Sequence, residues 1–556
     1  MCTSVNENVK SRNRVLGRAS AMSGSRWPAR GSVTHLGKAA DAEEREISVV
    51  RLLARLALIT ILFLVPGCSI GPRYVRPAVQ SPPAYKELQQ PIANGSNGWQ
   101  TAEPSDGAAR GKWWKAFNDP KLDELEEKAS ASNQQIAAAA DNFLVARALV
   151  RQARSQYFPT LSTNPSMIRT LPSPAEFSGL QAGGSSSSGV AVKTFNDFSL
   201  PFDASWEPDF WGRIGNNVKA GTYAAQASAA DLENVRLGIQ AELAVDYFEL
   251  RAQDSLKELS DSTVAAYRQS VDLTRSQFAA GLSSDEAVAQ AEAQLKAAQA
   301  QDTNLGIQRA QYEHAIAVLV GQSASAFSLQ ANEFEPDVAA IPAGIPSQLL
   351  ERRPDIAVTE RAVAQANAEI GVAKAAYFPA ILLSAAGGFG NSSISNWLTW
   401  PSRFWSVGPS VAETIFDAGL RGATVQQYRA NYDETVANYR QTVLTAFQQV
   451  EDNLAALRIL RQEIDEQNAA TDAAARALKE ATVRYKAGLD PYLNVVAAQT
   501  ALLNEQQTAV TIRAEQKIAE VELIKALGGG WNASEIPSAK EVRMKTADSA
   551  AQTPGQ

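Results

Sequence analysis

Two long stretches without proline constrain the fold of this 556-residue chain more than any other feature. No proline lies between Pro208 and Pro336, or between Pro409 and Pro491. Proline breaks helix interiors, and both stretches are rich in Ala, Gln, Glu, Leu and Arg, so they can form unbroken helices. Residues 213–277 alone would form a helix about 98 Å long. A helix of that length cannot lie inside a globular core, so it must pack against other long helices.

The apolar stripes on these predicted helices are narrow and rich in alanine. A solid bundle core would contain more Leu and Ile, so small residues on both faces favour a curved sheet of helices around a wetted lumen. A solvated coiled coil is the alternative that this pattern leaves open.

The chain also contains an internal duplication. FAAGL at 278–282 matches YKAGL at 485–489. Tyr-Phe-Pro ends an alanine-rich run at 157–159 and again at 377–379. We therefore predict two repeats, each with a helix, two strands, a very long helix, a turn and a further long helix.

The duplicated motifs also predict where helices begin and end. Glycine in the AGL motif suits a helix C-terminus, and Ser283, Ser284 or Asp490 can cap the following helix. Proline biases the residue before it toward extended geometry, so each Tyr-Phe-Pro predicts a change from helix to strand. The aromatic residues of this motif either form an interfacial belt or pack the junction.

Alternating residues predict strands between the helices. In residues 198–206 one face carries Phe198, Leu200, Phe202, Ala204 and Trp206, and the other carries Ser199, Asp203 and Ser205. Residues 404–416 alternate similarly, with Trp405, Val407 and Val411 on one face. This alternation is typical of transmembrane β-strands.

Each repeat has an outward and a returning strand joined by a Gly/Ser/Asn-rich loop, at 183–189 and 390–396. This predicts four strands per chain. Four strands cannot close a barrel in a bilayer, because open edges leave backbone groups unsatisfied. Three copies would give about twelve strands, enough for a pore, so a trimer is favoured.

Residues 51–68, RLLARLALITILFLVPGC, read as a secretory signal that ends in a cysteine. Two arginines precede a short apolar run, too short for a spanning helix. The end looks like a bacterial lipobox, although Pro66 is unusual in it, and predicts N-palmitoyl and S-diacylglycerol groups on Cys68. A plain signal peptide is the alternative. The polar residues before it are interpreted as an over-extended gene start, with the true start near Val49 or Val50.

Composition argues against an enzyme and against nucleic-acid binding. The formal charge is −7, so the chain has no overall basic footprint. Both cysteines, Cys2 and Cys68, lie near the start, and His314 is the only histidine after His35. Thiol, metal and acid–base chemistry therefore have few candidate residues, and we expect no cofactor and no metal site.

Four segments carry a resemblance to a known family. They are CSIGPRYVRP after the lipobox, WWKAFNDPKLDELEEKASASNQQIAAA (113–139), WEPDFWGRI (206–214) and LLERRPDIAVTERAVAQANAEIGVAKAAYFP (349–379). The chain resembles the outer membrane factors, or TolC-like channel proteins, in the lipoprotein branch that serves RND efflux systems. The resemblance covers residues 68–530.

The resemblance implies a mixed α/β membrane protein: a homotrimer whose twelve-stranded transmembrane β-barrel, four strands per chain, continues into a long periplasmic α-helical barrel. It implies a location in the outer membrane, lipid-anchored and spanning, with a large periplasmic portion. The implied function is passive export of drugs or other small toxic compounds with a periplasmic adaptor and an inner-membrane RND transporter. The alternatives are a duct for protein secretion with an ABC exporter, and a periplasmic adaptor or structural coiled coil.

The resemblance also implies a gate at the periplasmic helix tips. Tyr485 keeps the family's aromatic residue, and Asp490 stands where the best-known relatives have a basic residue. Asn494 and Ala497 stand where aspartate rings often occur. On the partner turn Ala287 replaces a carboxylate, although Asp285 and Glu286 are close by. We expect neutral hydrogen bonds and Asp490 to hold this gate, and the alternative is that Asp490 only caps a helix.

Arg352-Arg353-Pro354-Asp355 is interpreted as a structural helix start, because proline suits the first turn and aspartate favours the N-terminal dipole. The predicted segments are an N-terminal extension (1–50), a signal peptide (51–67), an acylated extended segment (68–112), a first repeat (113–335), a crossover linker (336–348), a second repeat (349–530) and a disordered tail (531–556).

Overall fold

The computed structural model describes residues 70–89, 112–171, 194–332 and 349–543. The chain divides into two units, Met1–Pro66 and Gly67–Gln556, and all described residues belong to the second. The predictions for the signal peptide, for Cys68 and for the linker 336–348 therefore concern residues outside the described ranges.

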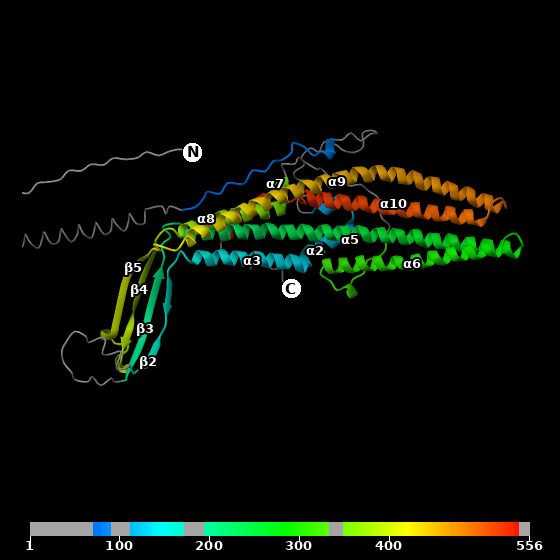
Figure 1. Ribbon diagram of the computed structural model, residues 1–556. Helices are drawn as coiled ribbons and strands as arrows, with labels where there is room; N and C mark the ends of the chain where they lie inside the picture. Colours follow the sequence, from blue (N-terminus) through cyan, green and yellow to red (C-terminus); the bar gives the residue numbers. More distant parts are fainter. Residues whose placement is uncertain (1–69, 90–111, 172–193, 333–348, 544–556) are drawn as a thin grey trace, which may run out of the picture. The chain divides into compact units, whose positions relative to one another are not determined.

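Two long helix hairpins dominate the described unit (Figure 1). Helices α5 (Arg213–Ala279) and α9 (Leu420–Lys486) each have 67 residues. Each turns back into a helix of 35 residues, α6 (Asp285–Leu319) and α10 (Tyr492–Ala526) respectively. The unbroken helix predicted over 213–277 is confirmed. Within the described ranges no helix is both long and apolar enough to cross a membrane.

The repeated AGL motif forms the hairpin turns. Gly281 and Gly488 have φ angles of 71° and 72°, the left-handed region that favours glycine. The amide of Leu282 donates to the carbonyl of Gln277 (2.8 Å), and that of Leu489 donates to Arg484 (2.9 Å). These hydrogen bonds satisfy carbonyl groups left open at the helix end.

The two following helices begin differently. The Ser284 hydroxyl accepts a hydrogen bond from the Ala287 amide (3.2 Å) and caps α6, as predicted. The N-cap of α10 is Pro491, whose side chain has no atom that accepts a hydrogen bond. The capping role considered for Asp490 is therefore wrong, because its carboxylate instead binds Arg484.

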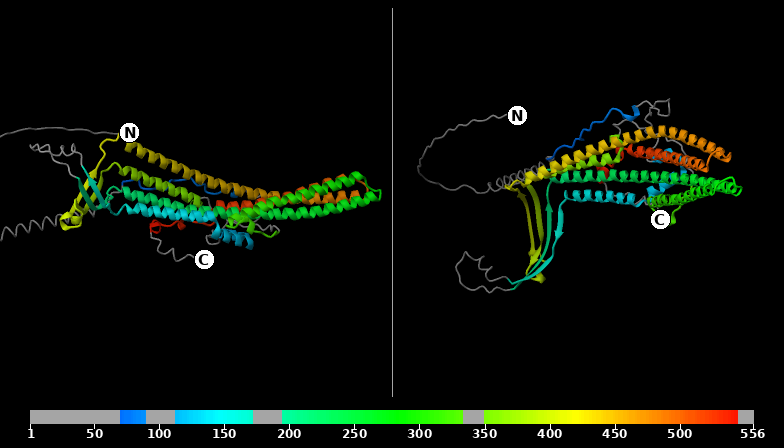
Figure 2. Two further views of the ribbon diagram at one scale, coloured as in Figure 1. Left: turned by 90° about the horizontal axis from the view of Figure 1, so that it is seen from below. Right: turned by 45° about the vertical axis from the view of Figure 1, so that its right-hand side comes forward.

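Shorter helices pack beside the hairpins: α2 (Pro120–Ser132), α3 (Gln134–Ser155), α7 (Leu349–Arg352) and α8 (Pro354–Ala375). Helix α3 packs on α5, α5 on α8, and α8 on α9. Figure 2 shows the same neighbours from two other directions.

Residues at or next to the first turn explain where α2 and α8 begin. The Asp119 side chain accepts from the amides of Lys121 and Leu122, and Pro120 occupies the first turn. Helix α8 begins at Pro354, as the interpretation of the Arg-Arg-Pro-Asp stretch requires. The buried Arg353 donates to Asp355 (2.6 Å) and to the carbonyl of Ala526 (2.9 Å). This stretch therefore ties the start of α8 to the end of α10.

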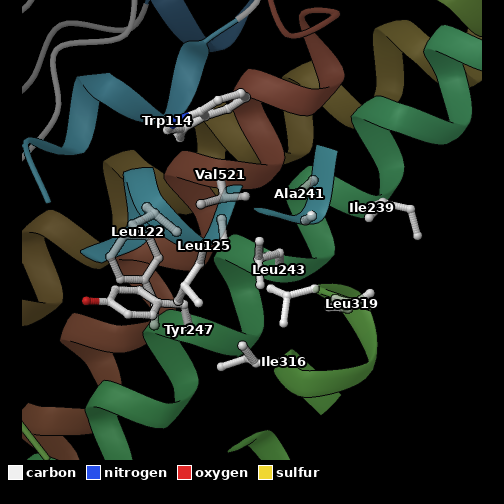
Figure 3. Close-up of a cluster of buried hydrophobic side chains, with 14 of the residues drawn as sticks. Trp114, Leu122, Leu125, Ile239, Ala241, Leu243, Tyr247, Ile316, Leu319 and Val521 are labelled. Carbon is white, nitrogen blue, oxygen red and sulfur yellow. The ribbon is translucent and has the colours of Figure 1, made fainter. Parts of the chain in front are cut away.

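The main hydrophobic core lies where α2, α5, α6 and α10 meet (Figure 3). Leu122 and Leu125 of α2 pack with Leu243 of α5, Ile316 of α6 and Val521 of α10. A second core joins α8, α9 and α10 to Tyr85, which precedes the short 3-10 helix η1 (Glu87–Gln89). Both cores are confined to the middle of the helix layer, so the helix hairpins extend beyond them.

The Tyr-Phe-Pro motifs lie between helix and strand, as predicted. Helix α3 ends at Ser155 and β1 begins at Thr160, while α8 ends at Ala375 and β4 begins at Ala380. Indole groups secure both junctions: Trp206 Nε1 donates to the Tyr157 carbonyl (2.9 Å), and Trp211 Nε1 donates to the Pro379 carbonyl (2.8 Å). The Trp211 ring also stacks on Phe378 at 4.9 Å. The Phe378 ring thus packs its junction, whereas the Phe158 side chain is 67% exposed, so an interfacial belt remains a prediction for this motif.

One antiparallel sheet contains all described strands: β1 (Thr160–Thr163), β2 (Ser166–Thr170), β3 (Phe195–Trp206), β4 (Ala380–Asn391) and β5 (Arg403–Ala412). The order is β1-β3-β4-β5, and β2 also pairs with β3. Strand β5 ends at Ala412, so the prediction that it continues to residue 416 is wrong.

Strands β1 and β2 form one interrupted strand. Thr163 pairs with Phe202 and Ser166 pairs with Ser199, which is the same register on β3. Pro165 lies in the gap and has no backbone N–H for the ladder. The chain therefore contributes four strands to the sheet, as predicted, and the first is broken at a proline.

The predicted disordered tail is wrong for residues 531–543. Trp531 packs with Ala230 and Ala357, and Val542 packs with Val150 of α3. A short helix, α11 (Ala539–Arg543), covers this region. Three widely spaced apolar anchors, Trp531, Ile536 and Val542, order the segment, whereas residues 544–556 lie outside the described ranges.

Candidate functional site

The register gives the sheet an apolar face and a polar face. The apolar face includes Leu161, Met167, Phe198, Leu200, Phe202, Trp206, Ile381, Leu383, Trp405, Val407 and Val411. The polar face includes Ser162, Ser166, Asp197, Ser199, Asp203, Ser205, Ser384, Ser406 and Ser410, with large apolar exceptions such as Phe404. The faces predicted for residues 198–206 are confirmed. Such a sheet suits a boundary between lipid and water.

The described residues leave much of the apolar face uncovered, although Phe198 is buried. Trp405 is 78% exposed and Val407 is 74% exposed. Exposed apolar surface of this extent indicates contact with a membrane or with another chain.

Both edges of the sheet are open within the described strands. The β1/β2 strand pairs only with β3, and β5 pairs only with β4. In a bilayer the backbone groups along these edges would lack hydrogen-bond partners. The sheet therefore requires strands from other chains if it enters a membrane.

The helix-hairpin tips bring together some of the predicted gate residues. The Tyr485 hydroxyl donates to Gln277 Oε1 (2.6 Å), which links α9 to α5. The Tyr485 ring lies 5.2 Å from the ring of Tyr492. Gln499 Nε2 of α10 donates to Ser270 Oγ of α5 (3.2 Å). Neutral hydrogen bonds therefore connect the two hairpins near their tips.

Tyr492 is buried beside these hydrogen bonds. It packs with Val271 of α5, Ala287 of α6 and Val495 of α10. Burial raises the pKa of Tyr492, so the ring stays neutral at physiological pH. The tips thus contain a small apolar cluster in addition to their polar contacts.

Asp490 forms an ion pair across its own turn. Arg484 Nε and Nη2 donate to its two carboxylate oxygens at 2.6 and 3.1 Å. This pairing lowers the pKa of Asp490, and Asn494 contributes a smaller effect in the same direction. Asp490 therefore stays ionised, next to Asn494.

The remaining predicted gate position is separate from this pair. Asp285 is exposed in the first turn of α6, where a carboxylate favours the helix dipole. Sequence reasoning missed Arg484, Gln277 and Tyr492. Arg484 lies in the last turn of α9, four residues before the turn glycine, and this position was the available signal.

Residues 70–89, called here the N-terminal strap, run along the helices from the helix–strand junction. The Ile70 amide donates to the Trp211 carbonyl (3.2 Å), and Asn216 Nδ2 donates to the Ile70 carbonyl (3.2 Å). Further along, Asn367 Nδ2 donates to the Pro72 carbonyl (3.0 Å).

The strap crosses the helices at a close backbone approach. A Cβ atom built on Gly71 of the strap would lie 3.0 Å from the Gly371 Cα of α8. The strap then continues to Glu87, whose carboxylate accepts from Arg458 (2.7 Å). Its first described residue is thus fixed beside the strands, and its last residues are fixed beside the second core.

The part of the chain that the structure describes contains no candidate metal-binding site. No group of three His, Cys, Asp or Glu side chains lies close enough together there to hold a metal ion.

Comparison with known proteins decides the family. Residues 125–322 and 345–529 match the model of the outer membrane efflux protein family. This chain belongs to the outer membrane efflux protein family. The two matched ranges carry the two hairpins α5–α6 and α9–α10, so the match includes the duplication described above.

Curated relatives in this family are similar over nearly their whole length. The chain is 31% identical to the probable efflux pump outer membrane protein TtgC of Pseudomonas putida, over 86% of this chain and 95% of that protein. It is 32% identical to the solvent efflux pump outer membrane protein SrpC of Pseudomonas putida, over 85% of this chain and 98% of that protein.

A solved structure supports the same assignment. The outer-membrane channel OprN matches with a TM-score of 0.74 and 27% identity, over 84% of this chain and 100% of that chain. The fold of this chain is therefore that of the TolC-like outer membrane channels, and its family places it in the outer membrane.

Proposed function

We propose that this chain is the exit duct of a tripartite efflux pump, and that it lets drugs or other small toxic compounds leave the periplasm passively. The observation that carries this proposal is the two-faced sheet with two open edges. Its apolar face suits lipid, and its polar face, with Asp197 and Asp203, suits a water-filled pore. A duct of this kind needs neither a catalytic residue nor a cofactor.

The proposed assembly is a homotrimer. Three copies of a four-stranded sheet would pair β5 of one chain with the β1/β2 edge of the next and close a ring of about twelve strands. The helix layer α3-α5-α8-α9 would close in the same way into a periplasmic helical barrel. The relatives are named efflux pump outer membrane proteins, which supports partners that belong to a pump. The proposed partners are a periplasmic adaptor and an inner-membrane RND transporter.

We also propose that Cys68 carries the lipid anchor, with N-palmitoyl and S-diacylglycerol groups. The strap supports this, because Ile70 is bound at the helix–strand junction. Two residues span at most about 7 Å, so acyl chains on Cys68 would reach the bilayer close to where the strands enter it. Several acyl chains make such an anchor stable.

The proposed duct is tested by purifying the full chain from outer membranes and measuring its oligomeric state and its conductance in planar bilayers. Heat-resistant trimers that conduct ions are expected. Soluble monomers without conductance would contradict the proposal. Deletion of the gene should increase sensitivity to drugs or solvents, whereas a defect confined to protein secretion would favour the ABC-linked alternative.

The proposed gate consists of Tyr485, Asp490, Asn494 and Asp285. If the Arg484–Asp490 pair helps to close the periplasmic entrance, Asp490→Ala and Arg484→Ala will each raise single-channel conductance by a similar amount. Lys486→Ala, which removes a neighbouring exposed cation of α9, should leave conductance unchanged. Unchanged conductance in Asp490→Ala would show that the pair only braces the turn.

A further inference from the structure

The charged residues of the strands are separated by sign between the two faces of the sheet. Arg169 and Arg403 lie on the apolar face, whereas Asp197 and Asp203 lie on the polar face. The aspartates suit a water-filled pore. The arginines require another explanation, because a cation on a lipid-facing surface is unfavourable at the bilayer midplane and is tolerated only near the interfaces.

Both arginines lie at the end of the sheet that is farther from the helices. Arg403 is the first residue of β5, whose other end leads to α9, and Arg169 lies near the end of β2, whose strand starts after α3. From Arg403 to Val411, β5 would span about 27 Å at about 3.4 Å per residue. A transmembrane barrel has an apolar band about 25 Å tall. Arg403 therefore lies at the rim of this band, on the side away from the periplasmic helices.

A tryptophan positions the Arg403 side chain. Its guanidinium carbon lies 3.6 Å from the centre of the Trp400 ring, and this ring is 71% exposed. The 3-10 helix η6 (Trp400–Ser402) that carries Trp400 is held by Ser402, which accepts from Asn391 Nδ2 (2.6 Å) and donates to the Asn396 carbonyl (2.6 Å). These hydrogen bonds hold η6 in place and therefore fix the position of the Trp400 ring on which Arg403 stacks.

Neither arginine is neutralised by its surroundings in the part of the chain that the structure describes. No carboxylate among those residues forms an ion pair with Arg403 or Arg169, although both side chains are exposed. A guanidinium group stacked on an indole can still use its edge, which matches the geometry of a phosphate. Tryptophan itself favours the level of lipid headgroups.

We propose that Arg403, stacked on Trp400, binds the phosphate of an anionic lipid headgroup in the outer leaflet of the outer membrane, and that Arg169 contributes a second cation. This rests on the proposed function, since it requires the strands to span that membrane. In a closed ring, β5 of one copy would meet the β1/β2 edge of the next, so both arginines would lie on one seam. Two cations suit a headgroup that carries more than one phosphate.

The test uses full-length trimers in detergent, titrated with diphosphorylated lipid A, with phosphatidylcholine and with inorganic phosphate, and reads bound lipid by native mass spectrometry. Wild type should bind lipid A tightly and the other two weakly. Arg403→Gln should weaken lipid A binding about five-fold, the effect of one cation at an anionic surface. Arg440→Gln, which removes an exposed arginine from α9, should bind lipid A like the wild type.

Three results would overturn this inference: undiminished lipid A binding by Arg403→Gln, equal binding of phosphatidylcholine, or equal binding of inorganic phosphate. Arg403→Lys keeps the charge and should retain most of the affinity. If Arg403→Gln does not assemble, Arg169→Gln is expected to show the same loss. Wild-type trimers that conduct but show no preference for lipid A would refute only this inference, whereas non-conducting monomers would refute the duct itself.

Discussion

At the scale of single residues, Asp254 is a buried charge of α5 that binds several partners. It accepts from Arg251 Nη1 (2.8 Å), Arg309 Nε (2.7 Å) and the Asn332 amide (3.2 Å). Arg251 and Arg309 also donate to carbonyl groups of Gln330 and Leu329 respectively. The carboxylate thus holds the chain that follows α6 against α5.

Removal of Asp254 should be strongly destabilising. Asp254→Ala leaves Arg251, whose side chain is 6% exposed, without its anion. Breaking a buried ion pair in this way costs about 3–5 kcal/mol. The free energy of unfolding, measured by chemical denaturation, should fall by this amount. Lys257→Ala, which removes a more exposed partner of Asp261 and Asp302, should change it by less than about 1 kcal/mol.

Glu126 is a second buried titratable group. It is fully buried in α2, and within the described residues neither carboxylate oxygen has a hydrogen-bond partner. Burial raises its pKa well above the ordinary value of 4.5, and Asp123 raises it further. The folded chain therefore keeps this proton at a pH where the unfolded chain has lost it.

This pKa shift predicts a pH dependence of stability. As pH rises above the unfolded value, the unfolded state binds fewer protons than the folded state, so the free energy of unfolding falls until the raised folded pKa is passed. Glu126→Gln removes this loss. The variant should melt at a higher temperature than the wild type at pH 8 and at a similar temperature at pH 4. An equal difference at both values would show that the carboxyl group does not titrate as inferred.

At the scale of elements, the turn glycines contribute through their backbone conformation. Gly488 has a φ of 72° and open space around its Cα, so alanine there would meet no clash but would be strained. Gly306 lies inside α6, also with open space. Gly488→Ala should lower the free energy of unfolding by about 1 kcal/mol, whereas Gly306→Ala should raise it by a similar amount. Thermal unfolding of the two variants measures this difference. Equal shifts of the melting temperature in the same direction would contradict this account.

The helices and strand faces were predictable because they depend on local patterns. The absence of proline is visible along each long stretch, and the glycine of each AGL motif and the alternation in residues 198–206 involve only a few neighbouring positions. The order of residues 531–543 was not predictable, because Trp531 and Val542 pack on α5, α8 and α3, which are distant in the sequence. The Arg484–Asp490 pair is local, but it depends on the geometry of the turn that brings the two side chains together, and the residue pattern does not specify that geometry.

At the scale of the whole molecule, the two strand aspartates should set the ion selectivity of the proposed duct. Asp197 and Asp203 share the polar face, and three copies would place about six carboxylates around the lumen. Asp197→Asn with Asp203→Asn should shift the reversal potential in a salt gradient toward lower cation preference. The Ser199→Ala and Ser205→Ala double variant is the matched control and should leave it unchanged. A reversal potential unaffected by the aspartate variants would place these residues outside the conducting path.

The strand register also determines how the strands lean. Thr160 and Ala380 are equivalent, since each directly follows a Tyr-Phe-Pro motif. Thr160 pairs with Ser205, and Ser205 pairs with Ser384, so the residue of β4 that lies level with Thr160 is Ser384. Ala380 comes four residues before Ser384. This stagger amounts to about 13 Å along the strand over two inter-strand spacings of about 4.8 Å. In the proposed ring, strands that lean this steeply would enclose a wider bore than the same number of upright strands, so the offset between two duplicated motifs would widen the duct.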